Sequence, residues 1–213
     1  PLSNFKTNLN GVLNLLEIIR SDNKKILIHT STSEVFGSAI YTPMDENHPL
    51  QAQSPYSASK IAADQACISY FNSYSAPVII LRPFNTYGPR QSNRAVIPTI
   101  INQIINQKKQ LNIGSLFPRR DFTYVDDTVE AYLCALKAKN IYGEQFNLGI
   151  SKDFSVLETI KIISKLMNYN CKIKEEKIRK RPLKSEVNKL LSNNKKAIKL
   201  LKWKPKFTGI KGF

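Results

Sequence analysis

Apolar residues recur at helical spacing in several segments of the chain. Over residues 8–20 they lie three or four positions apart and form one stripe, which consists of Leu9, Val12, Leu13, Leu16 and Ile19. This spacing is typical of a helix with one buried face. Comparable patterns predict further helices over residues 56–73, 95–107, 126–139, 154–167 and 193–203.

Short apolar runs between these helices predict strands. The run Ile26-Leu27-Ile28 lies in a segment that ends at Thr30, and similar short strands are expected over 76–82 and 146–149. Apolar, β-branched runs of this length are typical of strands buried in a parallel sheet. Residues 41–54 are rich in proline and polar residues, which indicates a loop. Strands that alternate with helices predict an α/β fold with helices on both faces of a parallel sheet.

Length and composition narrow the class of protein. The chain has 213 residues, of which 42% are hydrophobic, enough for one large domain or one domain with a small lobe. No apolar run of membrane-spanning length and no signal peptide is visible in the sequence. Cys67, Cys134 and Cys171 are far apart, so we expect reduced cysteines in a cytoplasmic protein. His29 and His48 have no partner at metal-ligand spacing, and we predict no metal.

The formal net charge of +16 raises the question of a nucleic-acid partner. Roughly half of the basic residues lie beyond Lys161, where acids are sparse. The lysines are scattered, however, and the sequence contains no platform of aromatic and basic residues of the kind that binds single strands. We therefore predict no nucleic-acid partner, and we expect part of the positive charge to serve an anionic small ligand.

A polar stretch, TSTSEVFG (residues 30–37), follows the first predicted strand. Ligands of open α/β sheets bind just beyond the carboxyl ends of strands. Hydroxyl and carboxylate groups at this place therefore indicate a site of chemistry. The alternative is a turn whose serine and threonine side chains hydrogen-bond the local backbone.

A tyrosine and a lysine, Tyr56 and Lys60, lie one helical turn apart at the start of the next helix. Side chains at this spacing face the same side of a helix. A nearby ammonium favours the phenolate, so we expect Lys60 to lower the pKa of Tyr56 and to make it a usable general base. The alternative is an ordinary solvated pair, because this spacing alone is common by chance.

The sequence contains no G-x-G-x-x-G and no G-x-x-G-x-x-G, and it opens in a helix. We therefore expect no glycine turn in this chain that could cradle the pyrophosphate of a dinucleotide.

Seven segments, in this order, resemble the extended short-chain dehydrogenase/reductases, the NAD-dependent epimerase/dehydratase family that acts on nucleotide sugars. They are TNLNG (7–11), TSEVFG (32–37), SPYSASK (54–60), RPFNTYGPR (82–90), RDFTYVDD (120–127), FNLG (146–149) and WKP (203–205). The resemblance covers essentially the whole chain. It implies a Rossmann-like parallel sheet with a smaller C-terminal substrate-binding lobe. Members of this family start with a glycine-rich strand–turn–helix, so the resemblance also implies an N-terminally truncated chain that is inactive by itself.

The resemblance implies a reaction cycle without net redox change. Epimerases of the family usually carry Ser or Thr at the strand end without the acid, whereas 4,6-dehydratases carry Thr-Asp-Glu or Thr-Ser-Glu. The triplet Thr32-Ser33-Glu34 is similar to the second form. Tyr56, helped by Lys60 and Thr32, would take the C4 hydroxyl proton while NAD accepts the C4 hydride. Glu34 would then remove the C5 proton, water would leave C6 with help from Glu34 or Ser33, and the hydride would return to C6.

The segments 33–60 and 81–101 look closest to the nucleotide-activated N-acetylglucosamine 4,6-dehydratases of the legionaminic-acid pathway. One alternative within the family is UDP-glucuronate decarboxylase, which shares Thr-Ser-Glu, and another is a nucleotide-sugar epimerase. An alternative of another class is a non-catalytic basic binding module. Fold and motif analogy alone leave these hypotheses open.

The resemblance also assigns binding residues. The residues that it implies for NAD are Thr30, Tyr56, Lys60 and Pro83. Those that it implies for the nucleotide sugar are Asn85, Arg94, Val96, Arg120, Asn147, Arg181 and Glu186. Arginine suits a diphosphate because its planar fork binds phosphate oxygens in pairs.

Simpler roles are open for several of these residues. Arg120 could form a surface ion pair with Asp121, and Glu186 could be a solvated acid. Pro83 could merely end its strand. Asn8 could bend its helix and hold a water near Lys60, or could cap the helix.

For the domains, we predict that residues 1–90 form the C-terminal part of the NAD-binding domain and carry the catalytic residues. Residues 91–213 would mainly form the substrate-binding lobe, with 120–150 returning to the Rossmann core. The resemblance further implies a homodimer.

Overall fold

The computed structural model describes residues 1–22, 24–170, 172–179, 182 and 186–209. Its first helical stretch is longer than the sequence pattern predicts. Helix α1 (Leu2–Asn4), the π-helical segment η1 (Phe5–Asn10) and helix α2 (Gly11–Ser21) follow one another without a gap. Asn8 lies inside η1 and its Nδ2 donates to Ser59 Oγ at 2.9 Å, so the cap suggested for Asn8 is wrong.

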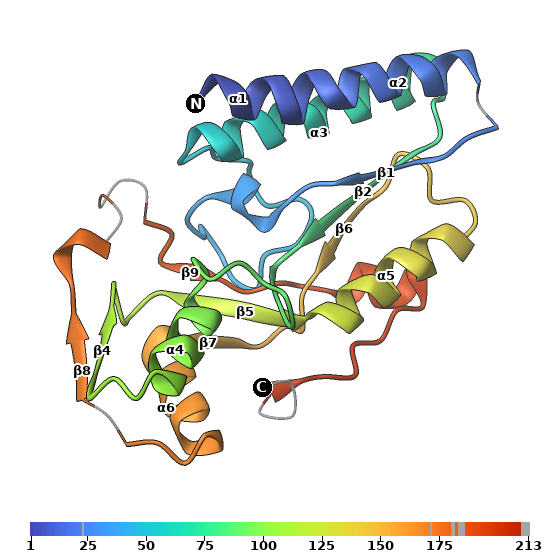
Figure 1. Cartoon of the computed structure of the whole chain (residues 1–213). Coiled ribbons are helices and arrows are strands. Elements are labelled where there is room, and N and C mark those ends of the chain that lie inside the picture. Colours follow the sequence, from blue (N-terminus) through green and yellow to red (C-terminus); the bar gives the residue numbers. More distant parts are fainter. Residues whose placement is uncertain (23, 171, 180–181, 183–185, 210–213) are drawn as a thin grey trace.

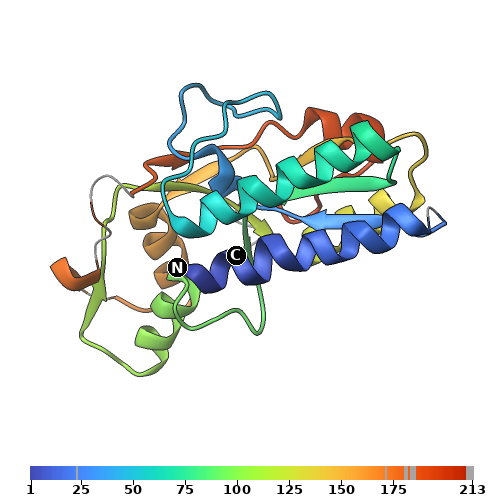
Figure 2. The ribbon, with the colours of Figure 1, turned by 90° about the horizontal axis from the view of Figure 1, so that it is seen from above.

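The central sheet consists of β1 (Leu27–Thr30), β2 (Val78–Pro83) and β6 (Gln145–Leu148). All pairs are parallel, in the order β1-β2-β6. Helices α2 and α3 (Pro55–Tyr74) lie side by side on one face, and α5 (Val125–Lys137) lies on the other (Figures 1 and 2). This arrangement confirms the predicted α/β fold with a parallel sheet.

Two apolar cores hold the helices against the sheet. The core between α2, α3 and the sheet contains Val12, Leu16, Ile19, Ala63, Cys67, Ala76, Val78 and Ile80. The core on the opposite face contains Ile79, Leu81, Ala131, Ala135, Ile141, Phe146, Leu148, Ala197, Leu201 and Trp203. Because alternate residues of β2 enter different cores, the strand is buried on both faces, which explains its continuous apolar sequence.

A smaller lobe lies beside this sheet and contains elements that the hydrophobic pattern did not reveal. It consists of β3 (Asn85–Tyr87), α4 (Val96–Ile105), β4 (Gln110–Ile113), β5 (Arg119–Tyr124), β7 (Asp153–Ser155), α6 (Val156–Leu166), β8 (Lys172–Glu175), η3 (Lys177–Arg179) and β9 (Lys189–Leu190). Strand β5 pairs with β3 and β9 in parallel and with β7 in antiparallel orientation. Strand β4 pairs with β8 in parallel.

The end of the described chain returns to the central sheet. The π-helical segment η5 (Ala197–Leu201) is shorter than the helix predicted over 193–203. The indole of Trp203 is fully buried and its Nε1 donates to Asp127 O on α5 at 2.8 Å. Residues 197–203 thus join the core around β6, in addition to the segment 120–150 for which a return was predicted. The proposed division into domains stays a prediction.

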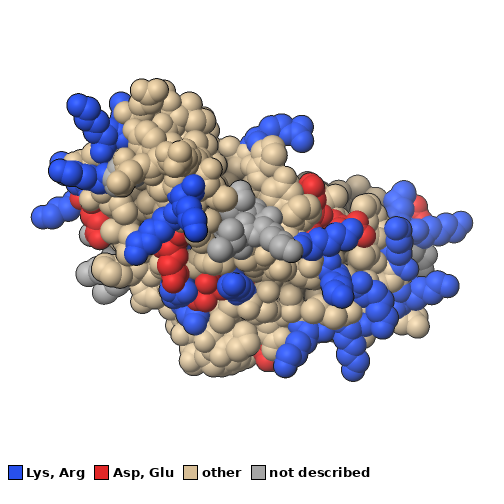
Figure 3. Space-filling view, turned by 90° about the horizontal axis from the view of Figure 1, so that it is seen from below, with Lys and Arg blue, Asp and Glu red and all other residues tan. Residues whose placement is uncertain are grey.

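Figure 3 shows one face of the molecule, on which basic side chains lie mainly toward two sides and outnumber the acidic ones. No helix in the described part of the chain is long and apolar enough to cross a membrane.

Candidate functional site

The polar stretch after β1 forms one short helical turn. Thr32 is extended and caps η2 (Ser33–Phe36), and its Oγ1 accepts a hydrogen bond from Glu34 N at 3.2 Å. The turn ends at Gly37, which has a φ of +63°, and an added Cβ there would lie 2.5 Å from Gln51 O. Glycine is therefore required at this position. The turn contains a hydrogen bond between the Thr32 side chain and the local backbone, as the alternative interpretation of a simple turn requires. It also places Thr32 and Glu34 at the carboxyl end of β1.

Helix α3 brings a tyrosine to this turn. Ser54 and Ser57 form a capping box and Pro55 occupies the first turn, so the helix begins at a fixed place. One residue later, Tyr56 is hydrogen-bonded to the side chain of Thr32 and lies within the electrostatic reach of Glu34. The structure thus brings together Thr32, Glu34 and Tyr56, which the sequence separates by two dozen residues.

The pKa of Tyr56 departs from the sequence-based expectation. Burial is the largest influence and raises it, the hydrogen bond with Thr32 lowers it, and the carboxylate of Glu34 raises it. The net shift is upward, so the prediction that Lys60 lowers the pKa of Tyr56 is wrong for this geometry. Lys60 Nζ instead donates to Thr30 O at 2.9 Å.

Burial also lowers the pKa of Lys60, and Asp64 and Cys67 act in the opposite direction. Thr30 is held from a second side, because its Oγ1 accepts a hydrogen bond from Tyr132 OH at 2.9 Å. The carboxyl end of β1 therefore joins α3 and α5 through Thr30.

A cavity of about 380 Å³ lies in the lobe. Five of the residues predicted for substrate lie in its wall, namely Asn85, Arg94, Val96, Arg120 and Glu186. Arg120 Nη2 contacts Glu186 Oε1 at 3.4 Å, and Arg120 Nη1 donates to Arg119 O at 3.0 Å. Arg179 also lines the wall. Three arginines and one glutamate line this wall, and the guanidinium of Arg179 is paired with Glu176 at 2.7 Å. The excess of basic residues suits an anionic ligand.

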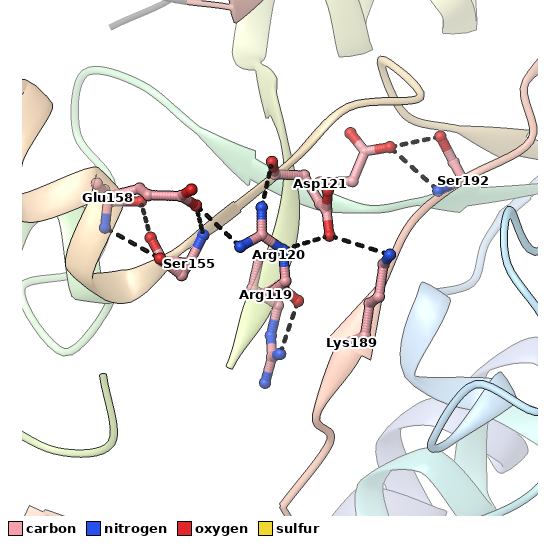
Figure 4. Close-up of polar contacts among 9 residues, drawn as sticks. Arg119, Arg120, Asp121, Ser155, Glu158, Lys189 and Ser192 are labelled. Atoms are coloured by element: carbon pink, nitrogen blue, oxygen red, sulfur yellow. Dashed lines mark hydrogen bonds and ion pairs between the residues drawn. The ribbon is translucent and has the colours of Figure 1, made fainter. Parts of the chain in front are cut away.

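The suggested ion pair between Arg120 and Asp121 is wrong. Asp121 is fully buried and accepts hydrogen bonds from Ile150 N, Ser151 N and both Ser192 N and Ser192 Oγ. The neighbouring Arg119 forms ion pairs with Asp153 at 2.8 Å and Glu158 at 3.0 Å. Figure 4 shows these contacts on β5, with Arg120 extending away from them. Asp121 therefore anchors β5, while Arg120 is directed to the cavity.

The structure does not bring every predicted residue to the cavity. Asn147 is fully buried, its Nδ2 donates to Met44 O at 3.1 Å, and its backbone N donates to Glu46 at 2.8 Å. Pro83 lies at the end of β2, paired with Leu148. Ser33 is buried within η2. Arg181 and Cys171 lie outside the described residues.

Other residues of the cavity wall were not predicted from the sequence, and Arg179 and Asn112 are two of them. Arg179 precedes the predicted Arg181 by two positions in the same basic run, and this run was the only signal for it. Asn112 comes from β4, a short polar strand without a motif. Among the described residues, no group of three or more His, Cys, Asp or Glu side chains could hold a metal.

Several known proteins resemble this chain in sequence and fold. Residues 1–212 match the family model described as GDP-mannose 4,6-dehydratase. The dTDP-glucose 4,6-dehydratase of Bacillus anthracis, solved with NAD, superposes with a TM-score of 0.89 at 29% identity, covering 98% of this chain and 65% of that one. The UDP-glucuronic acid 4-epimerase of Bacillus cereus, solved with UDP-glucuronic acid and NAD, has a TM-score of 0.86 at 30% identity, covering 96% and 64%.

A curated relative represents a third activity. UDP-glucuronic acid decarboxylase 4 of Arabidopsis thaliana is 30% identical over 214 residues, which cover 97% of this chain and 46% of the relative. The chain thus spans less than two thirds of each of these three proteins. The solved relatives hold NAD, which confirms the predicted cofactor for the family.

Proposed function

This chain belongs to the GDP-mannose 4,6-dehydratase family of extended short-chain dehydrogenase/reductases, and we propose that its protein is an NAD-dependent nucleotide-sugar 4,6-dehydratase. The substrate that we propose is UDP-N-acetylglucosamine or a close analogue. The observation that carries the proposal is the carboxylate of Glu34 beside Tyr56 and Thr32. Dehydration needs a base for C5 in addition to a base for the C4 hydroxyl, and Glu34 after β1 and Tyr56 on α3 are the candidates for these two roles.

Each residue has a separate task in the proposed reaction. Tyr56 removes the proton from the C4 hydroxyl, and Thr32, hydrogen-bonded to it, supports the phenolate. The 4-ketone that results acidifies the hydrogen on C5, which Glu34 removes. Ser33 and Glu34 are the candidates for protonating the hydroxyl that leaves C6, and C5 is reprotonated after the loss of water.

The residues that we propose for NAD fit a nicotinamide ribose at the carboxyl end of the sheet. Lys60 and Tyr56 supply an ammonium and a phenol there, and Thr30 and Pro83 end the adjacent strands β1 and β2. When bound, NAD supplies the oxidation at C4 and the reduction at C6. The chain's own groups position the sugar and move its protons.

We propose that the cavity holds the nucleoside diphosphate. Arg120, Arg94 and Arg179 supply positive charge for the phosphates, and Asn85 supplies an amide whose Oδ1 is buried without a partner among the described residues. Glu186 is the candidate for accepting hydrogen bonds from ribose hydroxyls. The two sites are joined in the chain, because β2 ends at Pro83 in the first site and β3 begins at Asn85 in the second.

We expect Arg120→Ala to weaken the binding of UDP by about 10- to 100-fold, since a hydrogen bond to a charged group contributes roughly 1.5–3 kcal/mol. Calorimetric titration with UDP measures this loss. Arg119→Ala is the matched control, because Arg119 points to Asp153 and Glu158 and does not line the cavity. Equal losses in both variants, or unchanged affinity in Arg120→Ala, would remove Arg120 from the diphosphate site.

UDP-glucuronate decarboxylation is the second candidate. Thr32-Ser33-Glu34 and the arginine-lined cavity fit both reactions, because decarboxylation also begins with oxidation at C4 of a UDP-sugar.

A cytoplasmic location, the absence of a nucleic-acid partner and a homodimer also stay proposals. For the dimer, the supporting observation is that Leu15, Ile18 and Tyr74 on α2 and α3 expose 47%, 50% and 57% of their surface.

A further inference from the structure

A cluster of three charged or titratable side chains lies under the candidate catalytic residues and has no assigned role. Asp64 on α3 is fully buried, and its Oδ1 contacts His29 Nε2 on β1 at 3.1 Å. Its Oδ2 accepts hydrogen bonds from Arg82 Nε and Nη2 on β2 at 3.0 and 2.9 Å. Arg82 is fully buried as well, and His29 is only 4% exposed.

Stability alone does not explain this cluster. A buried ion pair loses so much hydration that apolar side chains of the same volume are often as stable or more stable. We therefore looked for a functional role of Asp64, His29 and Arg82, which come from one helix and two strands. The guanidinium of Arg82 also lies over the ring of Phe36, 5.1 Å from its centroid, and Phe36 belongs to the same turn as Glu34.

The position of Asp64 on α3 connects the cluster to the site. Tyr56, Lys60 and Asp64 follow one another at intervals of four residues, so they line one face of the helix. Exposure falls along this line, from 37% at Tyr56 to none at Asp64. The carboxylate therefore lies one turn below the ammonium of Lys60, on its buried side.

The electrostatics agree with the geometry. Burial, the largest influence on Lys60, lowers its pKa, and Asp64 is the first group that opposes this effect. For Asp64, burial is also the largest influence and raises its pKa, but the contacts with His29 and Arg82 outweigh it and keep the carboxyl ionised.

We propose that Asp64 is a positioning residue whose carboxylate, fixed by His29 and Arg82, keeps the ammonium of Lys60 charged and directed at the carboxyl end of β1. Lys60 Nζ then remains on Thr30 O at 2.9 Å. The inference rests on the proposed function in one respect, namely that Tyr56 acts on the sugar and Lys60 on the nicotinamide ribose beside it.

Other titratable and charged groups face this pair from each neighbouring element. They are His29 on β1, Glu34 on η2, Arg82 on β2, Cys67 and Tyr56 on α3, and Tyr132 on α5, which reaches Lys60 through Thr30. Glu34 acts on Tyr56, whereas Asp64 is the acidic side chain that acts on Lys60. Burial raises the pKa of Cys67 to about 12 and that of Tyr132 above its usual value, so both are neutral near pH 7. Asp64 is therefore the group in this set that can hold the charge on Lys60.

The test measures the titration of Lys60 in the complete protein without turnover. Competitive acetylation with acetic anhydride over a range of pH, read by mass spectrometry of the peptide that contains Lys60, gives its pKa. We expect Asp64→Asn to lower this pKa by about one unit or more, because an opposite charge nearby shifts a pKa by roughly 1–3 units. Asp64→Glu should retain the wild-type value.

Two further variants keep the result interpretable. Asp121→Asn removes another fully buried, hydrogen-bonded carboxylate, which lies on β5 and is not among the groups that act on Lys60, so it should leave the pKa of Lys60 unchanged. If Asp64→Asn does not fold, the double variant Asp64→Asn/Arg82→Gln removes both charges without leaving a buried cation. It should lower the pKa of Lys60 as well.

An unchanged pKa of Lys60 in a folded Asp64→Asn or double variant, judged by thermal unfolding, would overturn the inference. So would an equal shift in Asp121→Asn. The labelling experiment needs no substrate. If Asp64→Asn lowers the pKa of Lys60 but the wild-type protein does not dehydrate the nucleotide sugar, the proposed function is contradicted and the inference on Asp64 is not.

Discussion

Glu34→Gln in the complete protein is expected to lose the dehydration of UDP-N-acetylglucosamine while it still oxidises C4. Only the removal of the C5 proton and the departure of water require the carboxylate, and the amide cannot act as a base. General acid–base assistance contributes roughly 10²–10⁴-fold in rate, so we expect a loss of that size. Mass spectrometry of the product measures the loss of water, and the absorbance of the reduced cofactor measures the oxidation at C4.

The control for this variant is Glu130→Gln on α5, a helix on the opposite face of the sheet from α3. It makes the same chemical change away from the proposed site and should dehydrate at the wild-type rate. Normal dehydration by Glu34→Gln would exclude Glu34 as the C5 base. Loss of both reactions would indicate that Glu34 also supports Tyr56, which lies within its electrostatic reach.

Tyr56→Phe is expected to lose the first oxidation by a similar factor of roughly 10²–10⁴, because the phenolate is the proposed base for the C4 hydroxyl. The transient absorbance of the reduced cofactor after mixing with the nucleotide sugar measures this step. Tyr74→Phe, on the same helix and 57% exposed, is the matched control. An unchanged transient in Tyr56→Phe would remove Tyr56 from the mechanism.

The raised pKa of Tyr56 also predicts how the rate of C4 oxidation depends on pH. Since the phenolate is the active form and burial raises its pKa, the rate of C4 oxidation should increase as pH rises above neutrality. The hydrogen bond from Thr32 opposes this effect, so its loss should move the rising limb to higher pH. A rate that falls over this range would contradict the role of the phenolate as base.

The central sheet could be predicted because its sequence is locally consistent. Strand β2 is apolar on both faces, α2 has one apolar stripe, and the capping box at Ser54 marks the start of α3. The strands of the lobe were harder to predict from the sequence. Strand β5 begins with Arg119, Arg120 and Asp121, and its polar side chains are paired by segments distant in the sequence. Tertiary contacts, and not local preference, make this segment a strand.

The candidate site shows the same difference. Thr32, Tyr56 and Lys60 lie where their motifs indicated, since a strand end and a helix start fix them. Their electrostatics could not be predicted from spacing, because the pKa of Tyr56 depends mainly on burial and on Glu34. Asn147 was predicted from a motif, and it is buried against Met44 and Glu46 because the loop 41–54 folds over it. Arg179 reaches the cavity through η3, which no periodic pattern revealed.

The most direct test of the central claim is the mass of the product that the complete protein forms from UDP-N-acetylglucosamine in deuterated water. We expect the loss of one water molecule and the uptake of one deuteron at C5, because C5 is deprotonated and then reprotonated by solvent. A product of unchanged composition would indicate an epimerase. No reaction with this substrate, together with loss of carbon dioxide from UDP-glucuronate, would indicate the decarboxylase and contradict the account.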